Sequence, residues 1–467
     1  MSRIPLGRFA RIIPLTLMCL FGLLVLLTGG GARNDIQSLI ILRPAAILLG
    51  AFAIWHLRGE QFATIRSVSI LLLLLMLLMA IQLIPLPPEL WSRLPGRTLL
   101  TEIFEAASLR QPWYPISLSP IRTWNSLFAL TIPAATLLLF AGLPREHRYT
   151  LLPCLLSAGL VSAVMGLAQA VGPSRSALYF YEITNGESAV GIFSNRNHQA
   201  AFLACMLPML AVYIGKMPGT RWRNTMVLGA CALGLFFVVM ILATSSRGGV
   251  LLVAAALLVS WAFNLWTIDD QRLPVRSGRV GPWLASGITV LLAIGVIVSS
   301  RAPSLLRLFR ANEGDEIRLA LIRPLLDMFM MYFPVGAGYG AFEGVYRVIE
   351  PLELTGSSYL NHAHNDLLEF AIEGGLPGLV LLFAFLTWWV RRAAQLWRDR
   401  GAGARGHVFS RLGAGVTALL MMGSLFDYPL RTPAIAMLFA IGCGWMGSGT
   451  MSRRSSILGR SDIQARG

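Results

Sequence analysis

Apolar runs of about 20 residues recur along the whole length of this chain. A helix needs about 20 apolar residues to cross the hydrocarbon core of a bilayer, where no backbone polar group can stay unpaired. The composition agrees, because 55% of the 467 residues are hydrophobic and 13% are charged, whereas soluble domains are about 25% charged. The sequence therefore predicts an all-α polytopic membrane protein. It excludes a soluble enzyme, a disordered protein and a secreted disulfide scaffold.

The apolar runs predict about 12 transmembrane helices, with a large outer loop before the tenth. Their expected positions are 12–29, 38–56, 67–85, 121–142, 149–171, 197–215, 224–244, 248–267, 283–300, 366–390, 411–427 and 432–448. The first run resembles a signal peptide, but it is long and no small-residue cleavage site follows, so we interpret it as the first span. We expect residues 1–300 to hold spans one to nine, with outer loops at 86–120 and 172–196. Residues 301–365 are expected to form the large outer loop. Residues 366–448 would hold the last three spans, and residues 449–467 a basic tail.

The positive charges predict the orientation in the membrane. The formal net charge is +16, and every short loop that faces the cytoplasm is basic if the N-terminus is cytoplasmic. The positive-inside rule then predicts that both termini lie in the cytoplasm. These loop arginines also account for the high pI, so we expect no nucleic-acid partner. The five cysteines lie inside apolar runs without metal-ligand spacing, so we expect no disulfide and no zinc site.

The large outer loop contains a segment with helical character, NEGDEIRLALIRPLLDMFMMYF. Asn312 is a candidate N-cap, and Pro324 is expected to kink or restart the helix. The following stretch, PVGAGYGAFEGVY, has glycines at 336, 338, 340 and 344, too many for a helix.

Four polar clusters lie where a membrane makes such groups costly, and buried charges in spans are functional candidates by default. The first is Arg196, Asn197 and His198 at the outer mouth of span six; its alternative is an interfacial helix cap. The second is Arg247 in the ATSSRGG hairpin, where a guanidinium and glycine amides suit a phosphate. Its alternative is an interfacial anchor.

The third cluster is Arg318 with Arg323 on the loop helix, where Arg323 is expected to be solvated. The fourth is His362, His364 and Asn365 at the entrance to span ten. A histidine there suits removal of a proton from an acceptor hydroxyl; a metal-binding His-x-His pair and a helix cap are the alternatives.

Three further charged residues are interpreted as packing groups. Asp427 and Arg431 flank the hairpin between the last two spans and could form a salt bridge. Arg43, within span two, could pair with a buried carboxylate or reach the outer face.

These clusters, in this order, resemble the O-antigen ligase and O-antigen polymerase superfamily of bacterial envelope glycosyltransferases. The resemblance rests on QLIPLPPELWSRLPGR, YPISLSP, FSNRNHQA, TSSRGG, the stretch from Arg318 to GAGYGAFEG, and HAHNDLLEFAIEGGLPG. The last is the most specific, because His364, Asn365, Gly375 and Gly378 match the spacing of the ligase signature.

The resemblance implies a GT-C-like fold in the bacterial inner membrane and a glycan donor carried on undecaprenyl diphosphate at the periplasmic face. It implies that Arg247 and Arg318 hold the diphosphate, with Arg196 a weaker third, and that His364 activates the acceptor hydroxyl. Asn365 would orient that hydroxyl or the substrate, and His198 and His362 complete the substrate-binding candidates. Transfer would invert the anomeric carbon and need no cofactor and no metal, since arginine supplies the positive charge.

The acceptor stays open between lipid A–core oligosaccharide, which defines a ligase, a growing lipid-linked polysaccharide, which defines a polymerase, and a protein. The main alternative from another class is a transporter or flippase of lipid-linked glycans. Transporters often have paired broken helices or repeated halves, and neither is apparent in the sequence. A structural membrane protein would not need histidine and arginine clustered on the outer side.

Overall fold

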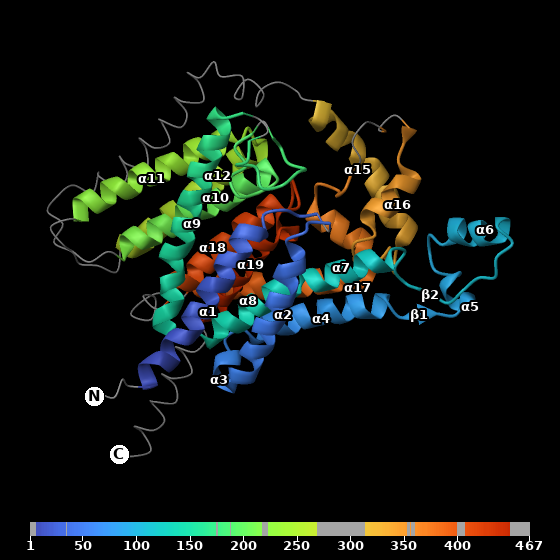
Figure 1. Cartoon of the computed structure of the whole chain (residues 1–467), viewed down its shortest axis with the longest axis horizontal. Coiled ribbons are helices and arrows are strands. Elements are labelled where there is room, and N and C mark those ends of the chain that lie inside the picture. The colour runs from blue at the N-terminus through green and yellow to red at the C-terminus, as the bar shows by residue number, and fades with distance from the viewer. Residues whose placement is uncertain are drawn as a thin grey trace, which may run out of the picture.

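The protein is a bundle of apolar helices in the computed structural model (Figure 1). The structure describes residues 6–33, 35–173, 176–186, 188–216, 223–268, 313–352, 355, 360–398 and 407–448. The expected span at 283–300, the N-cap at Asn312 and the tail at 449–467 lie outside the described residues.

Every other expected span coincides with helix. Ten of these are single helices: α1 (Leu6–Thr28), α2 (Leu39–His56), α4 (Arg66–Gln82), α9 (Arg145–Val171), α10 (Arg196–Gly215), α11 (Arg223–Ala243), α12 (Arg247–Ile268), α17 (Asp366–Arg398), α18 (Val408–Gly423) and α19 (Pro433–Ser448). The span expected at 121–142 consists of α7 (Pro120–Ala129) and α8 (Thr131–Gly142). By length and composition, 6 of the described helical segments can cross a membrane, and shorter apolar helices accompany them. An all-α membrane protein is therefore confirmed.

Short elements fill the outer loop at 86–120. A two-residue antiparallel ladder joins β1 (Pro85–Leu86) to β2 (Tyr114–Pro115), and α5 (Pro88–Trp91) and α6 (Thr98–Ala106) lie between them. Trp91 is fully buried, and its indole Nε1 donates to the carbonyl of Pro112 at 2.9 Å. The short helix α3 (Gly59–Phe62) connects α2 to α4 at the other end of the bundle.

The described part of the large outer loop consists of α15 (Glu313–Tyr332) and α16 (Phe342–Ile349). Pro324 lies inside α15 without ending it, so the helix does not restart there, and the alternative expectation of a kink stays a prediction. The glycine-rich stretch becomes helical only at Phe342. Leu325 of α15, Tyr346 of α16 and Ile372 of α17 belong to one small core that holds the loop against the bundle, and Figure 1 shows α15 and α16 beside the start of α17.

Hydrogen bonds between helix ends show which of them lie together at each end of the bundle. At one end, the amide of Ala434, the second residue of α19, donates to the carbonyl of Gly29 after α1 at 2.9 Å. At the opposite end, Arg148 of α9 donates to the hydroxyl of Ser448, which ends α19, at 2.8 Å. The starts of α10, α12 and α17 and the turn 424–432 gather at the first end, which is the outer end in the expected topology.

Helix α17 is broken at Gly375, where φ is 57°. Pro377 has no N–H, so the carbonyl of Glu373 lacks its helical donor. Gln82 Nε2 of α4 and the amide of Gly338 donate to that carbonyl instead, at 3.1 and 3.0 Å. A side chain at Gly375 would collide with the carbonyl of Pro334. Glycines of the loop stretch GAGYGAFEG and of the α17 stretch EGGLPG therefore let the outer loop dock onto the break in α17.

Candidate functional site

His364 is held against a carboxylate from a distant part of the chain. Its Nδ1 lies 2.9 Å from Oδ1 of Asp427, in the turn between α18 and α19. An ionised carboxylate only accepts hydrogen bonds, so Nδ1 carries a proton, and in the neutral imidazole Nε2 then presents a lone pair. No hydrogen bond to Nε2 is found within the described part of the chain, and the side chain is 26% exposed. His364 has a φ of 50°, an uncommon backbone conformation that clusters at functional sites.

Asp427 is fixed by further donors from the start of α10. Its Oδ2 accepts from Nδ2 of Asn195 at 3.1 Å and from Nδ2 of Asn197 at 2.8 Å. His198 approaches from behind, with Nε2 3.8 Å from Oδ2 and Nδ1 bonded to the hydroxyl of Thr432 at 2.7 Å. The ring of His198 is fully buried, so its contribution to the site passes through Asp427 and Thr432.

Tyr428 packs between the three histidines of the site. Its ring centroid lies 4.3 Å from that of His362, 5.2 Å from that of His364 and 5.2 Å from that of His198. Burial raises the pKa of the Tyr428 hydroxyl, to which Asn361 contributes a hydrogen bond. The phenol therefore stays neutral and keeps the imidazole rings in place.

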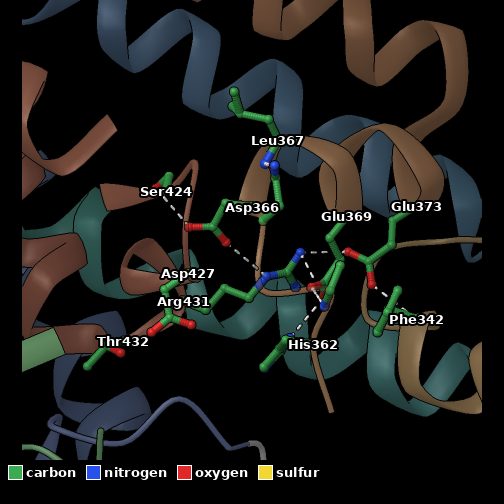
Figure 2. Close-up of polar contacts among 12 residues, drawn as sticks. Phe342, His362, Asp366, Leu367, Glu369, Glu373, Ser424, Asp427, Arg431 and Thr432 are labelled. Atoms are coloured by element: carbon green, nitrogen blue, oxygen red, sulfur yellow. Dashed lines mark hydrogen bonds and ion pairs between the residues drawn. The ribbon is translucent and has the colours of Figure 1, made fainter. Parts of the chain in front are cut away.

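The first turns of α17 present three carboxylates on one face, because positions 366, 369 and 373 follow the helical repeat. Figure 2 shows the guanidinium of Arg431 between them. Arg431 lies 3.3 Å from Asp366, 3.1 Å from Glu369 and 3.0 Å from Glu373. Burial alone would lower the pKa of Arg431, but these carboxylates hold it above its ordinary value. His362 completes the cluster, with Nδ1 2.8 Å from Glu369.

This cluster also holds the segment that carries His364. Glu369 Oε2 accepts from the amide of Ala363 at 2.8 Å, and Asp366 Oδ2 accepts from the hydroxyl of Ser424 at 2.8 Å. The carboxylates of α17 therefore connect the histidine segment to the turn that provides Asp427. The salt bridge expected between Asp427 and Arg431 is not the arrangement found, because each of them pairs with other groups.

Arg196 and Arg247 begin neighbouring helices at this end of the bundle. Arg196 is the first residue of α10 and Arg247 the first of α12, and both are half-buried. Ser246 caps α12 by accepting from the amide of Gly249 at 2.9 Å. A Cβ at Gly249 would lie 2.8 Å from that of Ala200, so the two helix starts are in close contact. Positive helix ends at this position favour an anion.

The remaining expected site residues have different positions. Asn365 is the N-cap of α17, since its Oδ1 accepts from the amides of Leu367 and Leu368 at 3.1 and 3.0 Å. The backbone of Arg318 lies in α15, and its side chain lies outside the described part of the chain. Arg323 is exposed.

Several residues of the site were not expected from the sequence. The N-cap of α10 is Asn195, one residue before the expected cluster at 196–198. Asp427 and Arg431, which the sequence suggests as packing groups, belong to the site. A usable signal existed for the carboxylates, since Glu369 and Glu373 lie four residues apart inside an expected span. Arg43 donates to Oδ1 of Asn125 at 2.8 Å, so it joins α2 to α7.

Together, the fold and the site define a multi-pass all-α membrane protein with a histidine–carboxylate pair and arginine-bearing helix starts at one end. Residues 231–383 match the family model Wzy_C, described as O-antigen ligase. This match supports the resemblance to the O-antigen ligase and polymerase superfamily over residues 231–383, and that family implies glycosyl transfer in general. The matched segment includes Arg247, Arg318, His362 and His364. No curated protein sequence matches the chain.

Proposed function

We propose that the protein is an inner-membrane glycosyltransferase of the O-antigen ligase or polymerase type. It transfers a glycan from undecaprenyl diphosphate to a sugar hydroxyl at the periplasmic face. The observation that carries the proposal is the pairing of His364 with Asp427, since it leaves an imidazole nitrogen oriented to take a proton. Both termini are cytoplasmic in this proposal, because the site lies at the end of the bundle opposite the basic residue Arg148 and the end of α19 at Ser448.

The proposed reaction is a single displacement. The acceptor oxygen attacks the anomeric carbon of the donor glycan, and the bond from that carbon to the diphosphate oxygen breaks on the opposite side. The diphosphate leaves with the bonding electron pair, so the anomeric configuration inverts. The hydroxyl proton passes to Nε2 of His364, and Asp427 stabilises the resulting imidazolium. Neither this proton transfer nor the displacement requires a cofactor.

The leaving diphosphate needs positive charge as the bond breaks. We assign this role to Arg247 and Arg318, with Arg196 as a weaker third. The start of α12 supports the assignment because its capped helix end places positive potential beside Arg247. Arginine stabilises phosphate bidentately, so the proposed chemistry is metal-independent. His362 and Asn365 lie on the side of His364 that the acceptor approaches in this proposal. His198 acts through Asp427.

Transfer with purified protein in nanodiscs tests this function. Undecaprenyl-diphosphate-linked glycan is supplied alone, then with lipid A–core. Longer glycans from the donor alone indicate a polymerase, and a product that requires core indicates a ligase. His364→Ala is expected to lower either rate by at least about 100-fold, and Arg247→Ala and Arg318→Ala to abolish it without reducing membrane insertion. Movement of the intact donor across the bilayer without any new glycosidic bond would instead support the flippase function.

A further inference from the structure

A cavity of about 860 Å³ lies within the helix bundle, beside the carboxylates of α17. Its volume is in the range of pockets that hold whole ligands, roughly 300–1,000 Å³. The walls include residues of α4, α7, α8, α17 and α19. His364, Arg196 and Arg247 are not among the lining residues, so these groups of the proposed reaction lie outside the cavity. The proposed mechanism therefore leaves the cavity without a role.

The inner part of the cavity is lined by apolar side chains. They include Leu72 and Leu75 of α4, Leu382 and Phe385 of α17, and Ala436 of α19, and each of these keeps part of its surface accessible. Ordered water does not fill such a space, because it needs polar partners, and an empty cavity costs stability in proportion to its volume. Within a bilayer, hydrocarbon chains are the material that can fill it.

Helix α4 needs a hydrocarbon neighbour on the side of the cavity. Leu72, Leu75 and Met79 line the cavity, and they recur every three or four residues, so they share one helix face. Leu73 and Leu77 are exposed on another face, where bilayer lipid would cover them in the expected topology. A helix that is apolar on all sides is stable when apolar groups surround it. A lipid chain inside the cavity would complete that environment for α4.

Two ion pairs lie at the polar mouth of the cavity, and all four of their residues line it. Arg33 lies 2.6 Å from Asp35, and Arg122 pairs with Glu343. The two pairs are neighbours, since a hydrogen bond from Arg33 and the positive charge of Arg122 both lower the pKa of Asp35. The mouth is accessible, because the side chain of Asp35 is 65% exposed and that of Arg122 is 35% exposed. Guanidinium groups bind phosphate and carboxylates accept hydrogen bonds from ammonium groups, so the mouth matches a headgroup that carries both charges.

We propose that this cavity binds a resident phospholipid whose zwitterionic headgroup carries a primary ammonium, as in phosphatidylethanolamine. One acyl chain lies between α4, α17 and α19. The phosphate lies beside Arg33 and Arg122, and the ammonium lies beside the carboxylates of the same two ion pairs. An anionic lipid fits less well, because five carboxylates and three arginines line the cavity. The lipid is not consumed and its binding requires no glycosyl transfer, so this site does not depend on the proposed function.

The lipid would support the candidate site through α4. Gln82, the last residue of α4, is buried. Its Nε2 donates to the carbonyl of Glu373 at 3.1 Å, and its Oε1 accepts from the amide of Tyr339 at 3.0 Å. These bonds hold the outer end of α4 against the break in α17. Without a lipid chain in the cavity, α4 would be poorly packed along the face that precedes these bonds, so we expect removal of the lipid to lower the unfolding temperature.

Native mass spectrometry of the full-length protein, extracted in a mild detergent, tests the site. We expect one tightly held phospholipid per chain. After exhaustive delipidation, phosphatidylethanolamine should rebind at one site and restore the unfolding temperature, whereas phosphatidylglycerol should bind more weakly. Ala436→Phe, which fills the cavity from α19, is expected to lower the occupancy by phosphatidylethanolamine by about fivefold or more. Ala80→Phe, on the exposed face of α4, is the matched control and should leave the occupancy unchanged.

A second variant tests the mouth without filling the cavity. Asp35→Asn combined with Glu343→Gln removes both negative charges of the mouth. In a folded protein it is expected to weaken phosphatidylethanolamine binding by about tenfold, and to leave phosphatidylglycerol binding no weaker than before. Glu60→Gln, exposed on α3 at the other end of the bundle, is the matched control and should change neither affinity.

The proposal is overturned if the delipidated protein binds no phospholipid at one equivalent, or if phosphatidylethanolamine and phosphatidylglycerol bind equally well. Unchanged occupancy in Ala436→Phe would overturn it as well, because the bound lipid would then lie outside the cavity. Displacement of phosphatidylethanolamine by undecaprenyl diphosphate, one molecule for one, would assign the cavity to the donor and would also overturn it.

Discussion

Asp427→Asn tests the proposed role of His364 through its partner. In the native chain, Oδ1 of Asp427 pairs with Nδ1 of His364 at 2.9 Å, while Oδ2 accepts from Asn195 and Asn197. An amide has only one oxygen, and the two asparagine donors favour its placement toward α10. The new NH₂ group then faces Nδ1 of His364, which must accept a hydrogen bond. The proton moves to Nε2, and the imidazole can no longer take one from the acceptor.

The expected loss follows from this change of tautomer. The same aspartate-to-asparagine change lowers kcat by about 10⁴ in Ser-His-Asp triads, and general base catalysis contributes about 10² to 10⁴ overall. We expect the transfer rate to fall by about 10² to 10⁴, which corresponds to roughly 3–5 kcal/mol in the activation free energy. The assay is initial transfer rate at saturating donor and acceptor, with the unfolding temperature measured on the same preparations.

Asp327→Asn is a matched control, since Asp327 is exposed on α15. It should leave the rate unchanged. A transfer rate for Asp427→Asn within threefold of the native rate would refute the reasoning. A loss that tracks the fraction of unfolded protein would refute it as well, because the substitution keeps the size and most hydrogen bonds of the side chain.

Three other predictions follow from the geometry. Arg431→Met leaves the carboxylates of α17 without their cation and is expected to lower the free energy of unfolding by about 3–5 kcal/mol, measured by denaturant unfolding in detergent. Arg391→Met, on an exposed face, should change that free energy little. Gly375→Ala places a Cβ against the carbonyl of Pro334 at a positive φ, so both unfolding temperature and transfer rate should fall, whereas Gly229→Ala, which meets nothing within 4 Å, should leave both near native values. Chelator treatment should leave transfer intact, and a loss that a divalent cation restores would contradict the arginine-only chemistry.

The helices could be predicted because each span must be apolar over about 20 residues, and that requirement is local. The break between α7 and α8 could not be seen from hydropathy, since apolar residues continue through it. Its cause is nevertheless in the sequence, because Pro133 in the first turn of α8 cannot donate to the carbonyl of Ala129. The docking of the glycine-rich loop onto Gly375 depends on tertiary contacts, and glycine count alone indicates only that the segment is not regular helix.

The site could be predicted only in part. His364 stood out because it lies in a specific motif, whereas its partner Asp427 is 63 positions away and no local pattern joins them. The burial of His198 also depends on the turn that follows α18. The spacing of positions 366, 369 and 373 places their carboxylates on one helix face, so this acidic face could be predicted from the sequence.

The most direct test of the central claim is a comparison of native protein and His364→Gln in the purified transfer assay, with donor at saturation and lipid A–core or a second lipid-linked glycan as acceptor. The account predicts that native protein forms a new glycosidic bond with inverted anomeric configuration. It also predicts that His364→Gln, folded to the same extent, forms that bond at least about 100-fold more slowly. Equal rates for the two proteins, or retention of the anomeric configuration, would contradict the account.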